Sequence, residues 1–567
     1  MQALVGNRWL LGTLFSLSLL TLILNNDAIS LWDQDEAAYA GFAHTMRATG
    51  NWVVPDFLWS EAHRKTPLLF WAIALAFQLC GETEFAARLP GLLAVSGTIA
   101  ALILLGRSLF GREVAWAAAL IASSSLLLPN LAKIALTDAP LLLMQTVAAL
   151  ALLHYLRQPR WPWLLLLWVA VSLGLLAKGP PIVLLCGGIW FGLLLLAPPR
   201  RRFWDWPLGL TLASATGPVL LWGRLAWQTD DCEFVRWLLD WYVLDRATGG
   251  TVFGQSGPPG YYLAVLALAF LPWLAFLPGA LVHLGRQCWQ RQPEAQALVA
   301  WLAAGWLFYE LIPSKLPAYA LGAYPALALV LARYLVESSL WQRSPWVRGG
   351  QYLFLVVAWS VAIALPLVAA HSLELDPGAL LAGSLVAGAL AGLASAAFWA
   401  WQRRRWQRGL AIAALSGPLL LLLAWGSLMP VLERHHSATQ RVAQVITAIA
   451  TPQTEVLFAR NFDLPSLPFY VAQTGHPYRA FGEDEPTDLL AAFATAPAPV
   501  AVFDDGAAVQ ALQAGLRAQG YTPASLEAVT GWFARFGESR TYFLAYRTPP
   551  LQAPSVQGGN VAALHQP

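Results

Sequence analysis

The sequence predicts an α-helical polytopic membrane protein that carries a small α/β domain at its C-terminal end. Of the 567 residues, 57% are hydrophobic and only 12% are charged, whereas soluble globular proteins carry about 25% charged residues. The mean hydropathy is +0.53. Long apolar stretches fill the first three quarters of the chain, and shorter alternating patterns replace them after residue 430.

Thirteen stretches are apolar and long enough to cross a bilayer, which takes about 20 residues per helix. The first follows Arg8 and lacks a small-x-small cleavage site, so we expect a retained signal-anchor. The stretches are 9–29, 84–106, 114–131, 134–156, 161–177, 180–197, 207–227, 260–284, 296–312, 316–336, 347–370, 378–400 and 409–430.

The short loops predict the orientation of the chain in the membrane. With a cytoplasmic N-terminus, the inward segments carry seventeen arginines and the short outward turns carry almost none. Basic residues favour the cytoplasmic side. We therefore expect an inner-membrane protein whose C-terminal region is extracytoplasmic.

Lysine is rare and is confined to the outward side. The chain has 35 basic residues, of which only Lys65, Lys133, Lys178 and Lys315 are lysines. Lysine suits a phosphate oxygen in a tight site because its ammonium group is a compact point charge on a flexible stem. Interfacial snorkelling of the side chain is the alternative for any one of them.

The outward regions define the predicted domains. The membrane domain covers 1–430 and includes the outer loops 30–83 and 228–259, with interfacial helices at 35–48 and 66–80. A soluble α/β domain follows at 431–547. We expect helices at 438–450, 464–473 and 506–519, and strands at 454–458, 499–503 and 541–547. The tail 548–567 is rich in Pro, Gly and Gln and is predicted to be disordered.

Two further features limit the possible functions. The C-terminal region carries eleven acidic residues against eight arginines, which gives no footprint for nucleic acid. Cys80 and Cys232 both lie in outward segments, and unpaired thiols are favoured over a disulfide between them.

The acidic cluster Trp32-Asp33-Gln34-Asp35-Glu36 is the sharpest candidate site. Three carboxylates within four residues at a membrane surface repel one another, so they indicate cationic partners or a catalytic task. A solvated acidic loop is the alternative. Asp138 is a second outward acid. Thr137-Asp138 precedes an apolar run, which is also a helix-capping signature, and both roles are compatible.

Outward cations accompany these acids. They are Arg64, Lys65, Arg88, Lys133, Lys178 and Lys315. Ionisable residues concentrate at the outer ends of the spans, and we find neither mid-span charges nor broken helices of the kind that transporters use. Acids beside phosphate-binding cations at an outer surface predict group transfer from a lipid phosphate. A carboxylate would act as general base and the cations would stabilise the departing phosphate.

These motifs resemble the polyprenyl-phosphate-sugar-dependent glycosyltransferases of GT-C fold. The branch that contains the lipid A aminoarabinose transferases, related to the protein O-mannosyltransferases, is the most similar. The matching segments occur in the family's order along nearly the whole chain: 32–55, 65–93, 136–143, 177–181, 314–332 and 464–474.

The resemblance implies roles for individual residues. Asp35, with Glu36 in the Asp-Glu pair, would be the catalytic or acceptor-positioning carboxylate, and Asp138 would be the second acid. Lys65 would contact the donor phosphate. Supporting donor-site and cavity residues would be Arg64, Arg88, Lys178, Lys315, Tyr39 and Tyr319.

The chain also departs from the aminoarabinose branch. Arg64 replaces an acid that helps to bind a metal in that branch, and the stretch 255–262 lacks its histidine. We therefore expect no bound zinc ion and predict no cofactor, because His63 alone rarely makes a site. A divalent metal stays open, although the ligands of that branch are missing. Ala38 stands where that branch has arginine, so the substrate is expected to differ from the branch's own.

The sequence thus predicts an inverting transfer of a hexose or pentose from a polyprenyl-phosphate donor to an extracytoplasmic acceptor. Inversion is implied by the resemblance alone. Lipid A, another glycolipid, a polysaccharide and a protein hydroxyl all stay open as acceptors. Two alternatives remain, a lipid-linked sugar flippase and a non-enzymatic membrane protein with an outer ligand-binding domain.

Overall fold

The computed structural model describes residues 1–197, 205–230, 232–245, 256–337, 339–372, 376–435, 438–460, 462, 464–482, 484–533 and 538–547. Two compact units make up the chain. The membrane unit comprises Met1–Asn26, Asn51–Pro55 and Lys65–Leu428. The second unit, called the outer unit after the side of the membrane predicted for it, comprises Asp27–Gly50, Asp56–Arg64 and Met429–Pro567. The outer unit thus includes two segments of the first long loop as well as the C-terminal region.

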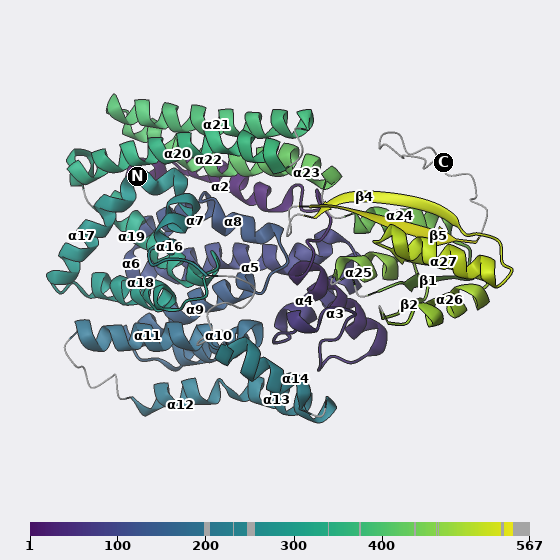
Figure 1. Cartoon of the computed structure of the whole chain (residues 1–567). Coiled ribbons are helices and arrows are strands. Elements are labelled where there is room, and N and C mark those ends of the chain that lie inside the picture. The colour runs from purple at the N-terminus through teal and green to yellow at the C-terminus, as the bar shows by residue number, and fades with distance from the viewer. Residues whose placement is uncertain are drawn as a thin grey trace. The chain divides into compact units, whose positions relative to one another are not determined.

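The membrane unit is a bundle of helices (Figure 1). Within the described residues, seven helices are long and apolar enough to cross a membrane, or up to nine when each of two bent pairs counts as one span. The helices of this unit are α1 Gln2–Gly6, α2 Arg8–Ile23, α4 Leu68–Cys80, α5 Glu84–Leu104, α6 Gly106–Phe110, α7 Arg112–Ser123, α8 Leu127–Asn130, α9 Asp138–Arg157, α10 Trp161–Lys178, α11 Pro181–Leu196, α12 Trp206–Ser214, α13 Gly217–Thr229, α14 Glu233–Trp237, α16 Tyr261–Ala269, α17 Leu277–Trp289, α18 Pro293–Leu311, α19 Tyr324–Glu337, α20 Pro345–Ser372, α21 Pro377–Gln402 and α22 Trp406–Leu423.

Three expected spans are not single straight helices. The stretch 207–227 is split between α12 and α13, because Pro218 lacks a backbone N–H and begins a new helix. Helices α7 and α8 meet at a bend of 61°, and α16 meets the segment Leu271–Trp289 at 104°. The latter segment contains Pro272 and Pro278. The expectation of unbroken spans was therefore wrong at these places.

The outer unit contains a mixed five-stranded sheet. Its strands are β1 Thr454–Phe458, β2 Tyr478–Ala480, β3 Ala498–Phe503, β4 Ser525–Phe533 and β5 Glu538–Tyr546. The order is β2-β1-β3-β5-β4, with β2, β1 and β3 parallel and the last two pairings antiparallel. Its helices are α3 Asp35–Thr49, α23 Met429–His435, α24 Thr439–Ile449, α25 Ser466–Gln473, α26 Pro486–Thr495 and α27 Gly506–Ala518.

The small α/β unit expected after residue 430 is confirmed, although β2, β4 and α26 were missed. Strand β2 has three residues, two of which are exposed, so no apolar run reveals it. The tail 548–567 and residues 246–255 of the second outer loop lie outside the described residues. All four cysteines are free, as favoured for Cys80 and Cys232.

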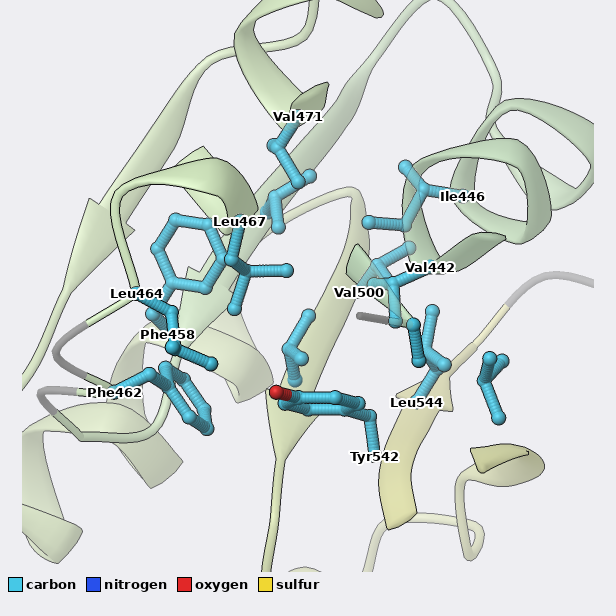
Figure 2. Packing of buried hydrophobic residues seen from close by; sticks show 14 of the residues in the cluster. Val442, Ile446, Phe458, Phe462, Leu464, Leu467, Val471, Val500, Tyr542 and Leu544 are labelled. Atoms are coloured by element: carbon cyan, nitrogen blue, oxygen red, sulfur yellow. The ribbon is translucent and has the colours of Figure 1, made fainter. Parts of the chain in front are cut away.

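Two apolar cores cover the opposite faces of the sheet, because side chains alternate along a strand. Val456 and Phe458 of β1 pack with α24 and α25 on one face, while Leu457 packs with α26 and α27 on the other. Figure 2 shows the first core, in which Val442 and Ile446 approach the strands from their helix and the ring of Tyr542 lies among aliphatic side chains. Burial raises the pKa of the Tyr542 phenol well above its usual range.

Candidate active site

The three carboxylates of the acidic cluster have separate partners within the outer unit. Asp33 accepts a hydrogen bond from the Ser466 hydroxyl on α25. Glu36 is buried, with 1% of its surface exposed, and its carboxylate accepts the Trp32 backbone N–H at 3.0 Å. Asp35 is the remaining acid. Of the three acids, Glu36 is thus buried, whereas Asp33 and Asp35 are partly exposed.

Asp35 is the first residue of α3 and its side chain is 47% exposed. Its Oδ1 accepts a hydrogen bond from the Tyr39 hydroxyl at 2.9 Å and lies 3.1 Å from Nδ1 of His63. Gln34, immediately before it, has φ of 76°, an uncommon conformation for a residue with a side chain. Such backbone strain clusters at functional sites. Asp35 therefore combines exposure, fixed orientation and a nearby imidazole.

The rest of the outer unit holds the segment that carries Asp35. The Leu31 backbone N–H donates to the Tyr470 hydroxyl at 2.7 Å, and the Ser30 backbone N–H donates to Glu433 at 2.9 Å. The segment that carries His63 is fixed as well, since Trp59 packs edge-on against Phe458 in the sheet core, with ring centroids 5.2 Å apart. The α/β fold is therefore the scaffold of the Asp35–His63 pair.

In the membrane unit, Asp138 and Lys178 form a buried ion pair. Asp138 begins α9 and Lys178 ends α10, and Oδ1 lies 2.6 Å from Nζ. Asp138 makes no cap for α9, and Thr137 makes no side-chain capping bond either. The expectation of a capping role at this position was therefore wrong. Tyr319 lies beside the pair, with its ring centre 5.7 Å from Nζ.

Two cavities of the membrane unit border this ion pair, since Lys178 lines both of them. One, of about 170 Å³, is lined by Asp138, Lys178, Tyr309 and Tyr319. The other, of about 670 Å³, has a mostly apolar wall and three cationic side chains: Lys65, Lys178 and Arg224. Its wall is supported by Trp222, whose indole N–H donates to the Val53 carbonyl at 2.9 Å. An apolar cavity with cations in its lining can hold a lipid phosphate.

Other predicted cations are committed to the backbone or to neighbouring acids. Lys315 donates to the carbonyls of Tyr309 and Glu310 at 2.6 and 2.7 Å and so caps the C-terminal end of α18. Arg88 is fully buried and donates to the Asn26 carbonyl at 2.6 Å.

Lys133 is similarly committed, since its ammonium group donates to the Leu24 carbonyl at 2.6 Å and to the Asn26 side chain at 2.9 Å. In the outer unit, Arg64 pairs with Asp56 at 2.8 Å. Arg88, Lys133 and Lys315 therefore stabilise the membrane unit through these contacts.

The residues around Asp35 do not fit a zinc ion. A zinc site draws on three or more His, Cys, Asp or Glu side chains. Here one carboxylate faces one imidazole, and Arg64 follows His63 in the chain. Within the described part of the chain, no group of three such ligands occurs.

Sequence reasoning missed two contributors. His63 was set aside as a lone histidine, yet it contacts Asp35, 28 residues earlier in the chain. Arg224 was not singled out, although it is an arginine within an apolar run on the outward half of its predicted span. The position of this charged residue within an apolar run was the sequence signal that could have identified it.

A many-helix membrane unit, an apolar cavity with cations in its lining and an exposed carboxylate are features of a membrane-embedded glycosyltransferase of GT-C type. A family profile described as dolichyl-phosphate-mannose-protein mannosyltransferase matches residues 64–227. The fold is similar to that of ArnT from Cupriavidus metallidurans bound to undecaprenyl phosphate. The TM-score is 0.74 at 20% identity, over 96% of this chain and 99% of that one.

Curated relatives specify the family. Undecaprenyl phosphate-alpha-4-amino-4-deoxy-L-arabinose arabinosyl transferase of Pseudomonas aeruginosa strain PAO1 is 29% identical over 74% of this chain and 75% of its own. The enzyme of the same name from Pseudomonas paraeruginosa is 30% identical over 66% and 69%. The chain belongs to this family of membrane glycosyltransferases, which confirms the predicted enzyme class and GT-C fold.

Proposed function

We propose that the protein transfers a sugar from a polyprenyl-phosphate donor to a hydroxyl or amine of an extracytoplasmic acceptor, with inversion at the anomeric carbon. The observation that carries this proposal is the cavity of about 670 Å³, whose apolar wall suits a polyprenyl chain and whose Lys65, Lys178 and Arg224 suit its phosphate. The names of the relatives support the donor class.

In the proposed reaction, Asp35 removes the proton of the acceptor nucleophile, which attacks the anomeric carbon. The bond between this carbon and the phosphate oxygen breaks, and polyprenyl phosphate leaves with the bonding electrons. Lys65 and its neighbouring cations stabilise the negative charge that develops on the phosphate. His63 and Tyr39 hold the Asp35 carboxylate in one orientation through the contacts at 3.1 and 2.9 Å.

Lys65 follows His63 by two residues in the chain. Glu36 and Asp138 have assigned contacts in the structure, so we propose that they support Asp35 and Lys178 and take no proton themselves. We propose that no zinc ion takes part, because the donor set at Asp35 is too small.

The acceptor and the membrane compartment can be proposed as well. We propose an inner-membrane protein with a cytoplasmic N-terminus and an extracytoplasmic site, from the arginine distribution. Lipid A or another glycolipid is the favoured acceptor, since the curated relatives carry out aminoarabinose transfer. Arg64 and Ala38 depart from that branch, so the transferred sugar is proposed to differ.

The test is sugar transfer by the purified protein in liposomes. A panel of labelled polyprenyl-phosphate sugars is offered with a membrane glycolipid extract, and wild type is compared with Asp35→Asn. Label that moves to the extract only with wild type supports the proposal and reveals both substrates. Movement of the donor across the bilayer without transfer to any acceptor would contradict it.

A further inference from the structure

At the ends of β1 and β3, the chain leaves the sheet of the outer unit toward opposite faces. These neighbouring parallel strands finish at Phe458 and Phe503. After β1 the chain enters α25, whose Leu467 packs on one face of the sheet. After β3 it enters α27, whose Leu512 packs on the other. Parallel sheets bind ligands at such a divergence, beyond the carboxyl ends of the strands.

A cavity of about 430 Å³ lies at this place, within the range of about 300–1,000 Å³ that small-molecule sites occupy. It is lined by the residues that follow β1 and β3 and by the adjoining parts of α26 and α27. The fold rule and the cavity are independent observations, and both indicate the same position.

The polar lining combines a donor with acceptors. Arg460 Nη2 lies 2.7 Å from Asp504 Oδ2, and their side chains are 38% and 9% exposed. Asp505 also lines the cavity, and one of its oxygens accepts the Ala507 backbone N–H at 2.9 Å at the start of α27. Thr487 adds a hydroxyl from α26. The ion pair holds the guanidinium and the carboxylate in a fixed relation at the rim.

The charge of the lining selects against an anion. Two carboxylates face one guanidinium, which is already paired, so a phosphate would meet net repulsion. Leu489, Leu490 and Leu512 supply an apolar surface beside these groups. A ligand with hydroxyls along its edges and C–H groups on its faces matches such a lining, and a pyranose ring has this construction.

We propose that this cavity is a saccharide-binding subsite, which takes a neutral or amino sugar unit of the acceptor. The inference rests on the proposed transferase function for its biological use, but the binding itself does not. The site gives the C-terminal domain a role in acceptor recognition in addition to holding the segment of Asp35.

The test is saturation-transfer NMR on the full-length protein in lipid nanodiscs. The probes are methyl glucoside and glucosamine, with inorganic phosphate as competitor, and all samples carry Asp35→Asn so that no turnover occurs. Ala511→Trp fills the cavity from an exposed position of α27, and Asp504→Asn removes a lining charge. Arg479→Gln is the matched control, because it breaks the Arg479–Glu455 pair elsewhere in the same domain.

We expect the saccharide signal to fall at least fivefold in both cavity variants and to persist in the control. Equal signals in all samples, or displacement of the saccharide by phosphate, would overturn the proposal. In active protein, Ala511→Trp should raise the KM for acceptor about tenfold and leave donor KM unchanged. If the saccharide binds but the active protein transfers sugar from no donor, the transferase proposal is refuted and the binding site still stands.

Discussion

The protein places an aspartate beside a cationic or titratable partner in each of its two units, and the two pairs differ in exposure. Asp138 and Lys178 have side chains that are 10% and 11% exposed and lie 2.6 Å apart. Asp35 is 47% exposed, beside a His63 that is 13% exposed. The Asp138 carboxylate is neutralised by Lys178 and shielded from solvent, whereas nearly half of the Asp35 side chain is exposed.

This difference in exposure indicates which of the two aspartates acts as the general base. Separation of a buried pair leaves an uncompensated charge, so such a pair resists the proton transfers that a general base undergoes. The Asp35 carboxylate is oriented by Tyr39 and His63, and its side chain is 47% exposed. We therefore expect Asp35 to dominate activity and Asp138 to dominate the stability of the membrane unit.

The largest effect is expected from Asp35→Asn. Loss of a general base costs about 10²–10⁴-fold in rate, so kcat should fall by about that factor while expression and the melting temperature stay near wild type. The measurement is transfer of labelled sugar in liposomes. Glu61→Gln is the control, since it removes an exposed carboxylate two residues from His63 and should retain activity. Comparable activity of both variants would end the assignment of Asp35.

Asp138→Asn should destabilise the membrane unit. The change leaves Lys178 buried without its counter-charge, which costs about 3–5 kcal/mol. Thermal unfolding in detergent should show a clearly lower melting temperature. The double variant Asp138→Asn with Lys178→Met should recover part of this loss, because no buried charge remains. A double variant less stable than the single one would contradict the pairing argument.

Substitutions of Lys65 test whether the charge and the shape of this side chain matter for donor binding in the cavity. A hydrogen bond to a charged group contributes about 1.5–3 kcal/mol, so Lys65→Ala should raise the donor KM about 10- to 100-fold. Lys65→Arg keeps the positive charge and should lose less. Initial rates over a range of donor concentrations give both values. If both substitutions have equal effects, the phosphate role is wrong.

Tyr470→Phe tests whether the outer unit positions Asp35. The variant removes only the hydroxyl that accepts the Leu31 N–H, and one neutral hydrogen bond contributes about 0.5–1.5 kcal/mol. We expect kcat to fall about three- to tenfold with donor KM unchanged. Tyr521→Phe, at an exposed tyrosine of the same unit, is the matched control. A change in donor KM alone would indicate a different role for Tyr470.

The smallest effect is expected from metal removal. Because Asp35 and His63 offer only two donor groups, treatment with a chelator should change the transfer rate by less than about twofold, an estimate that follows from the missing third ligand. Rates before and after dialysis against the chelator provide the measurement. A large loss that is restored by one divalent ion would show that a metal site forms with the substrate.

Some features of this protein were determined by the sequence alone. Composition and span length established the membrane class, and short apolar runs predicted β1, β3 and β5. The acid and lysine motifs also located Asp35, Lys65, Asp138 and Lys178. These signals are local, since each depends on residues close together in the chain.

The tertiary structure decided what each charged residue does. Asp33 binds Ser466 across 433 residues of chain, and His63 meets Asp35 across 28. Lys315 and Arg88 matched a phosphate-binding pattern but donate to backbone carbonyls. Which of several like charges stays open to a substrate depends on burial and on partners that are distant in sequence. No local pattern encodes these, and only the packed fold selects among them.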